Sequence, residues 1–167
     1  MKHAKKFLSA VLALMLLLSL AVPALAAGAQ ISQQKLTVDG EEIECEKYNI
    51  DGSNYFKLRD LAYLLNGTGS QFAVGYDEET GTVTIATGEA YKPNGTELAD
   101  IADNSATARP SSKTIMIDGE AVEGISVYNI GGSNFFKLRE LGDALGFEVD
   151  YDGASNTAMV RSSAGKS

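Results

Sequence analysis

The chain has 167 residues, of which 44% are hydrophobic and 22% are charged, as in an ordinary folded protein. A single cysteine excludes an internal disulfide framework, and 17 glycines with three prolines are too few for a collagen-like chain. Asp and Glu outnumber Lys and Arg by 22 to 14, and the resulting net charge of −8 disfavours binding to nucleic acid or to anionic lipid.

The first 26 residues have the three parts of a secretory signal peptide. Residues 1–6 are basic, residues 7–22 form an almost unbroken apolar run, and residues 23–27 offer a small-residue cleavage motif. The apolar run is shorter than the roughly 20 residues that a spanning helix needs. We therefore expect cleavage after Ala26 or Ala27 and no stable membrane insertion afterwards, with a retained N-terminal anchor as the alternative. The expected location is secreted, extracellular or loosely associated with the cell wall.

Cleavage would also remove a residue that many common catalytic and metal sites require. It leaves 11 Lys and Arg against 22 Asp and Glu, a net charge of −11, and it removes the only histidine, His3. Without histidine, Ser-His-Asp and Cys-His catalysis and most zinc and copper sites lack an essential group. Cys45 stands at an alternating strand position, which favours a buried apolar thiol over a nucleophile. We expect no enzyme, no cofactor and no metal.

The rest of the chain is a duplicated unit. Residues 48–59 (YNIDGSNYFKLR) recur as residues 128–139 (YNIGGSNFFKLR), with two differences in twelve positions. The match continues upstream into a shared Asp-Gly-Glu and downstream into a shared Tyr-Asp. Self-similarity of this kind identifies a repeated structural unit. We assign the first module to residues 31–86 and the second to residues 113–161.

Each module begins with a predicted β-hairpin. In the first copy, apolar and polar residues alternate over residues 36–38 and again over residues 43–45, around an Asp39-Gly40 pair that favours a type I′ turn. The alternation then changes phase before Tyr48, which indicates a break or bulge ahead of the shared motif. After a Gly-Ser-Asn turn, the motif predicts a short strand that leads into a helix.

The helix and a second hairpin complete the predicted module. In the first copy, apolar residues at 58, 61, 62 and 65 form one helical stripe, and leucines at 138, 141 and 145 repeat it. Residues 72–76 and 82–86 predict the closing hairpin, with residues 147–151 and 157–160 as its counterpart. The fold class is therefore α+β, with two tandem small modules. Each module has a β-hairpin, a motif strand, one amphipathic helix and a second β-hairpin.

Two further segments flank the second module. Residues 87–112 are polar and contain Pro93 and Pro110, which is typical of a linker or an extended packing arm. Residues 162–167 are small and polar, and we expect them to be a disordered tail. The helix-to-strand loop of the first copy is five residues longer, because Tyr48 to Phe72 spans 24 positions and Tyr128 to Phe147 spans 19.

The repeated motif YNI-x-G-SN-[YF]-FKLR-[DE]-L resembles the copper amine oxidase N-terminal-like domain, also called the stalk domain. The resemblance covers essentially all of residues 27–167, and residues 90–98 look like the connection between tandem stalk domains. It implies a small α+β module that is not itself catalytic. The oxidase chemistry of that family belongs to a separate large domain with three histidine copper ligands, and this chain has no histidine after His3.

The repeated motif also carries the candidate binding face. Its charged residues alternate with the leucines of the helix stripe, so they are predicted to point away from the core, where Arg could bind a carboxylate or a glycan and Tyr could stack on a sugar. The alternative is that these residues form ion pairs, solvated charges, turns and core. Likewise, the acidic runs at 77–79 and 150–152 favour hairpin turns over calcium sites. The candidate binding face comprises Asn54, Tyr55, Lys57, Arg59, Asn134, Phe135, Lys137 and Arg139.

Together, these features predict a secreted, non-catalytic binding or spacer protein at the bacterial cell surface. Its expected partners are cell-wall polymer or other extracellular and surface proteins, and exposed strand edges offer a route to self-association. One alternative is a small extracellular hydrolase that uses paired carboxylates. Another is a sensor or inhibitor that binds a small ligand between the modules.

Overall fold

A computed structural model describes residues 25–100 and 105–163. The fold is α+β, as predicted, and within these residues it is mostly β with two short helices. The predicted signal peptide lies almost entirely outside the described residues, as do residues 101–104 and 164–167. None of the described helices has the length and apolar character needed to cross a membrane.

The two copies have the same order of elements. The first contains β1 (Ala27–Ile31), β2 (Lys35–Val38), β3 (Glu41–Ile43), β4 (Lys47–Ile50), β5 (Ser53–Lys57), α2 (Leu58–Leu64), β6 (Phe72–Asp77) and β7 (Thr82–Thr87). The second contains β8 (Ser105–Pro110), β9 (Ile115–Ile117), β10 (Glu120–Val122), β11 (Val127–Ile130), β12 (Ser133–Lys137), α3 (Leu138–Leu145), β13 (Glu148–Asp152) and β14 (Thr157–Arg161). Strands β1 and β8 were not predicted, and each adds one strand at the start of its copy.

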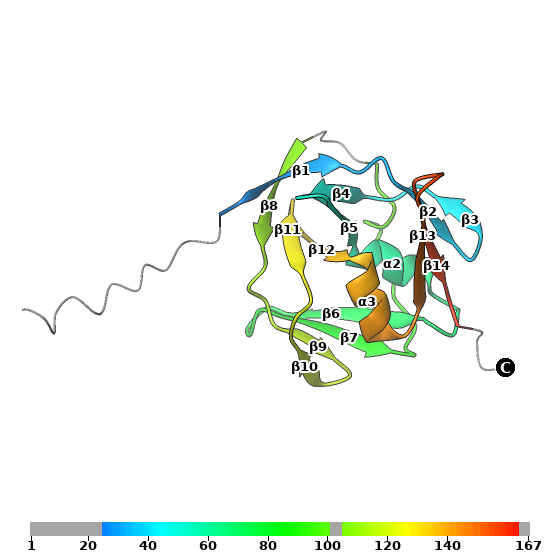
Figure 1. The fold of residues 1–167 in the computed structure, drawn as a ribbon. Coiled ribbons are helices and arrows are strands. Elements are labelled where there is room, and N and C mark those ends of the chain that lie inside the picture. Colours follow the sequence, from blue (N-terminus) through cyan, green and yellow to red (C-terminus); the bar gives the residue numbers. More distant parts are fainter. Residues whose placement is uncertain (1–24, 101–104, 164–167) are drawn as a thin grey trace, which may run out of the picture.

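The copies are interlocked. Strands β1-β4-β5-β12-β11-β8 close a barrel to which both copies contribute three strands. The first copy's hairpin β2–β3 joins the second copy's hairpin β13–β14 in one sheet, through a parallel pairing of β2 with β14. Hairpins β6–β7 and β9–β10 join in the same way through β7 and β9. Residues 31–86 and 113–161 are therefore repeats in sequence, but each four-stranded sheet contains one hairpin from each repeat. Figure 1 shows both helices between the barrel and these sheets.

Strands β5 and β12 separate two hydrophobic cores. Phe56 and Phe136 lie opposite each other in this antiparallel pair and face the core that contains both helices. Their neighbours Tyr55 and Phe135 face the interior of the barrel, where they are 4% and 1% exposed. The prediction that these two side chains lie on a binding face is wrong, because closure of the barrel buries the second face of the strands as well as the first.

The helices occupy the positions that the apolar stripes predict. Leu61 and Leu141 are fully buried between the barrel and the sheets. The second helix ends at Gly146, whose φ of 81° places it in the left-handed conformation that a C-terminal glycine favours. Each helix begins directly after a motif strand, and the N-cap residue is Lys57 in the first copy and Lys137 in the second.

The first hairpin of each copy has the predicted type I′ turn. Positive φ values occur at Asp39 and Gly40, 51° and 86°, and the second copy repeats them. The Asp39 carboxylate accepts hydrogen bonds from the backbone N–H and hydroxyl of Ser162, both at 2.8 Å. In the second copy, Asp118 binds Thr87 in the same way, at 2.8 Å and 2.6 Å. Each turn thus holds the end of the other copy's last strand.

The C-terminal segment differs from its prediction where it is described. Ser162 is bound by Asp39, and the backbone N–H of Ser163 donates to the Ser70 hydroxyl at 2.8 Å. The disordered tail expected from residue 162 is therefore wrong for Ser162 and Ser163, because side chains of the first copy order them. Residues 164–167 lie outside the described part.

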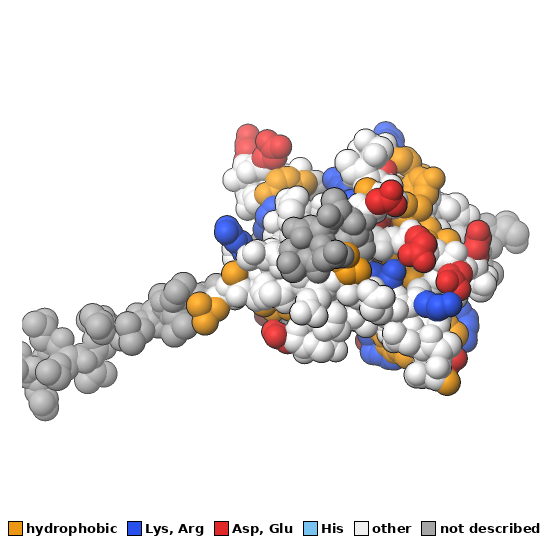
Figure 2. All heavy atoms as spheres, turned by 90° about the horizontal axis from the view of Figure 1, so that it is seen from above, with side chains coloured by type: hydrophobic (Ala, Val, Ile, Leu, Met, Phe, Trp, Pro, Cys, Tyr) orange, Lys and Arg blue, Asp and Glu red, His pale blue; other side chains and the backbone are white. Residues whose placement is uncertain are grey.

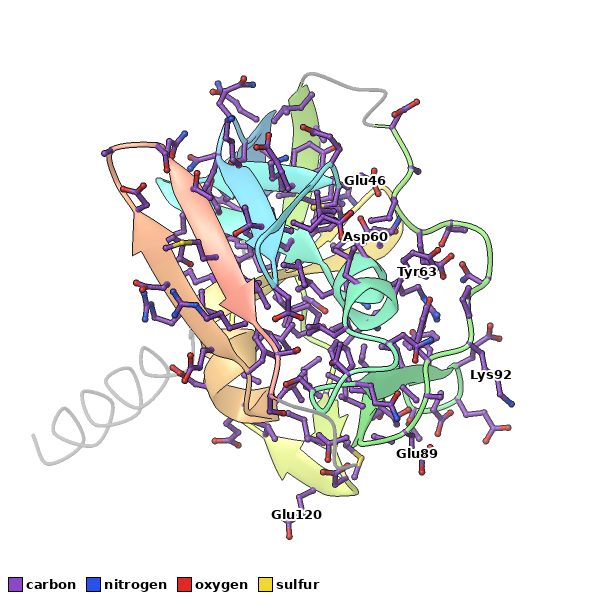
Figure 3. The ribbon with its side chains drawn as sticks, turned by 90° about the vertical axis from the view of Figure 1, so that its right-hand side faces the viewer. Glu46, Asp60, Tyr63, Glu89, Lys92 and Glu120 are labelled. Atoms are coloured by element: carbon purple, nitrogen blue, oxygen red, sulfur yellow. The ribbon has the colours of Figure 1, made fainter. Side chains whose placement is uncertain are left out.

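Residues 87–112 combine a packing segment with strand β8. Tyr91 is buried in the main core, and the Asn66 side chain binds both its backbone N–H and its carbonyl, at 3.0 Å and 3.1 Å. Figure 3 shows this segment beside α2, with Glu89 and Lys92 directed away from the protein. Residues 87–100 are thus an ordered arm that covers the first helix.

Candidate ligand-binding clefts

The motif residues of the two copies meet in a pair of related clefts. Cleft 1 has a volume of about 310 Å³ and cleft 2 about 370 Å³. In each, the Gly-Ser-Asn turn of one copy faces the Lys-Leu-Arg segment of the other, beside the tyrosine of the closing hairpin. Cleft 1 is lined by Lys57, Leu58, Arg59, Val74, Gly75, Tyr76, Val83, Asn94, Thr96, Lys113, Gly132, Ser133 and Asn134. Cleft 2 is lined by Gly52, Ser53, Asn54, Lys137, Leu138, Arg139, Glu140, Asp143 and Tyr151.

Pairing of β5 with β12 creates this arrangement. The two strands are antiparallel, with Phe135 opposite Lys57 and Lys137 opposite Tyr55. Each strand therefore begins beside the end of the other, where the helix starts. In each copy the motif forms a turn, a strand and the start of a helix. The turn of the first copy thus lies against the helix start of the second, and the turn of the second copy lies against the helix start of the first.

Lys57 forms one wall of cleft 1 and is only 5% exposed. Its ammonium lies 2.8 Å from the Glu46 carboxylate and donates to the Thr96 carbonyl at 2.8 Å. The alternative that this lysine is a solvated charge is wrong, because the arm after β7 covers it. Its charge is already compensated by Glu46.

Asp60 links the segments that surround Lys57. Its carboxylate accepts backbone N–H bonds from Leu98 at 3.0 Å and from Glu46 at 3.3 Å. Burial raises the pKa of Asp60, although the Leu98 N–H, the Lys57 ammonium and the Glu46 N–H favour its charged form. Figure 3 places Glu46 and Asp60 close together at the start of α2. Glu46, Asp60 and Lys57 thus connect the start of β4, the start of α2 and the arm.

Arg59 connects cleft 1 to the arm by a different contact. Its guanidinium donates to the Tyr91 hydroxyl at 3.2 Å, and that hydroxyl donates in turn to Glu97. The Glu97 carboxylate also accepts the backbone N–H groups of Asn94 and Gly95, both at 2.9 Å. Desolvation opposes the charged form of Glu97, but the hydrogen bonds from Tyr91 and these N–H groups outweigh it and lower its pKa to about 2.

The opposite wall of cleft 1 carries Lys113 and Tyr76. The Lys113 ammonium lies 4.1 Å from the centre of the Tyr76 ring, a cation–π contact, and the ring itself is largely exposed. Within the described residues, neither Lys113 nor Arg59 forms an ion pair with a carboxylate. Cleft 1 therefore has positive charge on both walls.

Cleft 2 has the same plan but a different charge balance. Lys137 lies 3.6 Å from the Glu140 carboxylate, and the Arg139 guanidinium stacks 5.0 Å from the centre of the Tyr151 ring. Asp143 adds a second carboxylate to the lining. Asn54 at its edge accepts hydrogen bonds from neighbouring side chains, including the Ser32 hydroxyl at 2.8 Å. Two cations and two carboxylates thus line this cleft.

Other sequence candidates have structural roles. Cys45 is buried in the main core, and burial, opposed by Lys47, raises its pKa to about 12, so the thiol is protonated and unreactive at neutral pH. Asp77 and Asp152 accept backbone N–H groups within their own hairpin turns. Across residues 25–100 and 105–163, no three His, Cys, Asp or Glu side chains converge as a metal site would require.

The structure brings together six of the eight residues of the candidate binding face, but in two groups that each combine both copies. Asn134 joins Lys57 and Arg59, and Asn54 joins Lys137 and Arg139. Sequence reasoning missed Tyr76, Tyr151 and Lys113. The tyrosines had a signal, since they occupy equivalent positions before a hairpin turn in both copies, whereas Lys113 lies outside the repeated motif.

No family model, no curated protein and no solved structure matches this chain. The resemblance to the stalk domain therefore stays a prediction from the sequence.

Proposed function

We propose that this is a secreted, non-catalytic binding protein of the bacterial cell surface, and that it takes its ligand in the clefts between its two copies. The observation that carries the proposal is the convergence of the repeated motif: the Gly-Ser-Asn turn and the Lys-Leu-Arg segment, which both copies retain, line two related clefts. Its volume and mixture of apolar and polar lining make cleft 1 comparable with known small-ligand sites, which span about 300–1,000 Å³.

Binding accounts for cleft 1 better than hydrolysis does. Glycoside hydrolysis by paired carboxylates needs an acid and a base or nucleophile that flank the substrate. The residues that line cleft 1 include three cations and no carboxylate. In cleft 2, Glu140 is engaged by Lys137 and accepts the backbone N–H of Ser126 at 2.6 Å, which fits a structural role. We retain the binding function and place the ligand between the copies.

The proposed partners are cell-wall polymer and exported proteins, in keeping with the signal sequence and the resemblance to stalk domains. A second copy of the chain is a further partner, because β3, β6, β10 and β13 are the outer strands of the two four-stranded sheets. An outer strand can extend its sheet by pairing with another chain.

A pull-down with isolated cell wall and secreted proteins of the source organism tests the proposal. The mature protein, residues 27–167, is compared with Tyr76→Ala, which alters cleft 1, and with Tyr151→Ala, which alters cleft 2 at the equivalent position. Saturable capture that one of these variants loses supports the proposal. Capture that neither variant affects, with both correctly folded by circular dichroism, contradicts binding in the clefts.

A further inference from the structure

We infer that cleft 1 takes a small polar ligand that carries a carboxylate or phosphate group. This inference rests on the proposed binding function and specifies the chemistry of the ligand. It follows from the charges that line the cleft, from their placement on two walls and from a comparison with cleft 2.

The first step concerns charge. The whole chain is acidic, with 22 Asp and Glu against 14 Lys and Arg, yet the residues that line cleft 1 include three cations and no carboxylate. Glu46 compensates one of them, Lys57, at 2.8 Å. Arg59 and Lys113 keep their charge without an ion pair among the described residues. An acidic surface interrupted by a positive hollow directs an anion to that hollow.

The second step concerns geometry. Arg59 projects from α2, and Lys113 lies just before β9, on the wall that also carries Tyr76. An anionic group between these walls can accept hydrogen bonds from a guanidinium and from an ammonium, which are stronger than bonds between neutral groups. Thr96 and Asn134 add polar side chains nearby. The ligand therefore needs an acidic group together with hydroxyl or amide groups.

The third step is the internal comparison. Cleft 2 has the same turn, the same Lys-Leu-Arg segment and an equivalent tyrosine, but Glu140 and Asp143 also line it. Glu140 lies 3.6 Å from Lys137 and reduces the positive potential there. Two clefts with a common plan thus differ in charge, and this difference predicts that anions select cleft 1.

Isothermal titration calorimetry of the mature protein with three matched probes tests the inference. Glucuronate carries a carboxylate, glucose 6-phosphate carries a phosphate, and glucose is the neutral probe of similar size. We expect at least one anionic probe to bind at least about tenfold more tightly than glucose, which corresponds to one favourable charged contact. The affinity should fall as salt is added, because the contacts are partly exposed.

Two single variants locate the bound anion. Lys113→Gln removes a cation from cleft 1, and Lys92→Gln removes an exposed cation that lines neither cleft. The inference expects Lys113→Gln to weaken anion binding about tenfold and Lys92→Gln to leave it unchanged. Equal affinity for glucose and both anionic probes, or equal loss in the two variants, overturns it.

A third measurement separates failure of the inference from failure of the proposed function. If none of the three probes binds but Tyr76→Ala still abolishes capture by cell wall, the small-anion inference falls and the binding function stands. If the probes do not bind and both Tyr76→Ala and Tyr151→Ala are captured as well as the wild type, the inference and the proposed function both fall.

Discussion

Gly142 and Ala62 occupy equivalent positions in the two helices but have different surroundings. A Cβ atom on Gly142 would lie 2.8 Å from the Val149 side chain and 2.9 Å from the Phe147 carbonyl oxygen. The shorter helix-to-strand loop of the second copy brings β13 this close to its helix. In the first copy the longer loop leaves room for the fully buried Ala62. A loop length thus determines which residue the helix tolerates.

Gly142→Ala is therefore expected to destabilise the protein by about 1–3 kcal/mol, because the backbone carbonyl cannot move away without displacing a strand. Ala62→Gly is expected to cost about 1 kcal/mol through helix propensity. Urea unfolding of both variants gives the free energies. A stabilising effect of Gly142→Ala, which its helix propensity alone would produce, would show that the contact is not tight.

Glu97 gives the arm a dependence on pH. Its pKa is lowered in the folded protein from 4.5 to about 2, so the folded state binds fewer protons than the unfolded state in this range. The resulting stabilisation is fully present above pH 4.5 and is lost as the pH falls toward 2. Thermal unfolding at several pH values should show the wild type losing its advantage over Glu97→Gln in this interval. Glu89→Gln, at an exposed position of the same segment, is the control and should retain the wild-type pH profile.

At the scale of elements, each helix depends on the leucines of one stripe. Leu61→Ala and Leu141→Ala each remove a fully buried side chain from the main core and should cost about 2–5 kcal/mol in free energy of unfolding. Tyr63→Ala is the matched control, since this helical residue is exposed and should cost far less. Similar small losses at all three positions would contradict the assignment of the buried helix face.

Sequence patterns predicted the turns and helices, because these elements depend on residues that are close together in the sequence. The Asp-Gly pairs identified their turns because they tolerate positive φ, and the spacing of leucines identified both helices. Strand β1 was missed because its sequence AGAQI has no clear alternation, and it exists through pairing with β4 and β8. Lys57 was misplaced for a related reason: it is the last residue of β5, directly before α2, and its contacts with Glu46 and Thr96, which lie elsewhere in the sequence, bury it. Contacts of this kind leave no periodic signal in the sequence.

At the scale of the whole molecule, neither copy contains a complete sheet. Strand β2 needs β14, β9 needs β7, and the barrel needs three strands from each half. The clefts were unpredictable for the same reason, because they require the turn of one copy and the helix start of the other. Acidic and basic side chains are interspersed on the face seen in Figure 2. This face therefore has no patch of a single charge that would repel one copy from the other.

This interlocking predicts that residues 27–104 and residues 105–167 do not fold when they are produced separately. Each half exposes the apolar face that the other half covers, so neither should show a cooperative thermal transition. Mixing the two halves should restore both the circular dichroism spectrum of the intact chain and a single complex of its size by gel filtration. Cooperative unfolding of either half alone would contradict the prediction and would indicate independent modules.

The parallel pairing of β2 with β14 also determines when the protein can fold. Lys35 pairs with Thr157, so strand β2, whose local partner is β3, lacks its second partner until nearly all of the chain has been synthesised. Contacts between residues so distant in sequence slow folding, because a long loop must close before they contribute any stability. The chain is therefore expected to stay open throughout synthesis and to reach its native state in one late step.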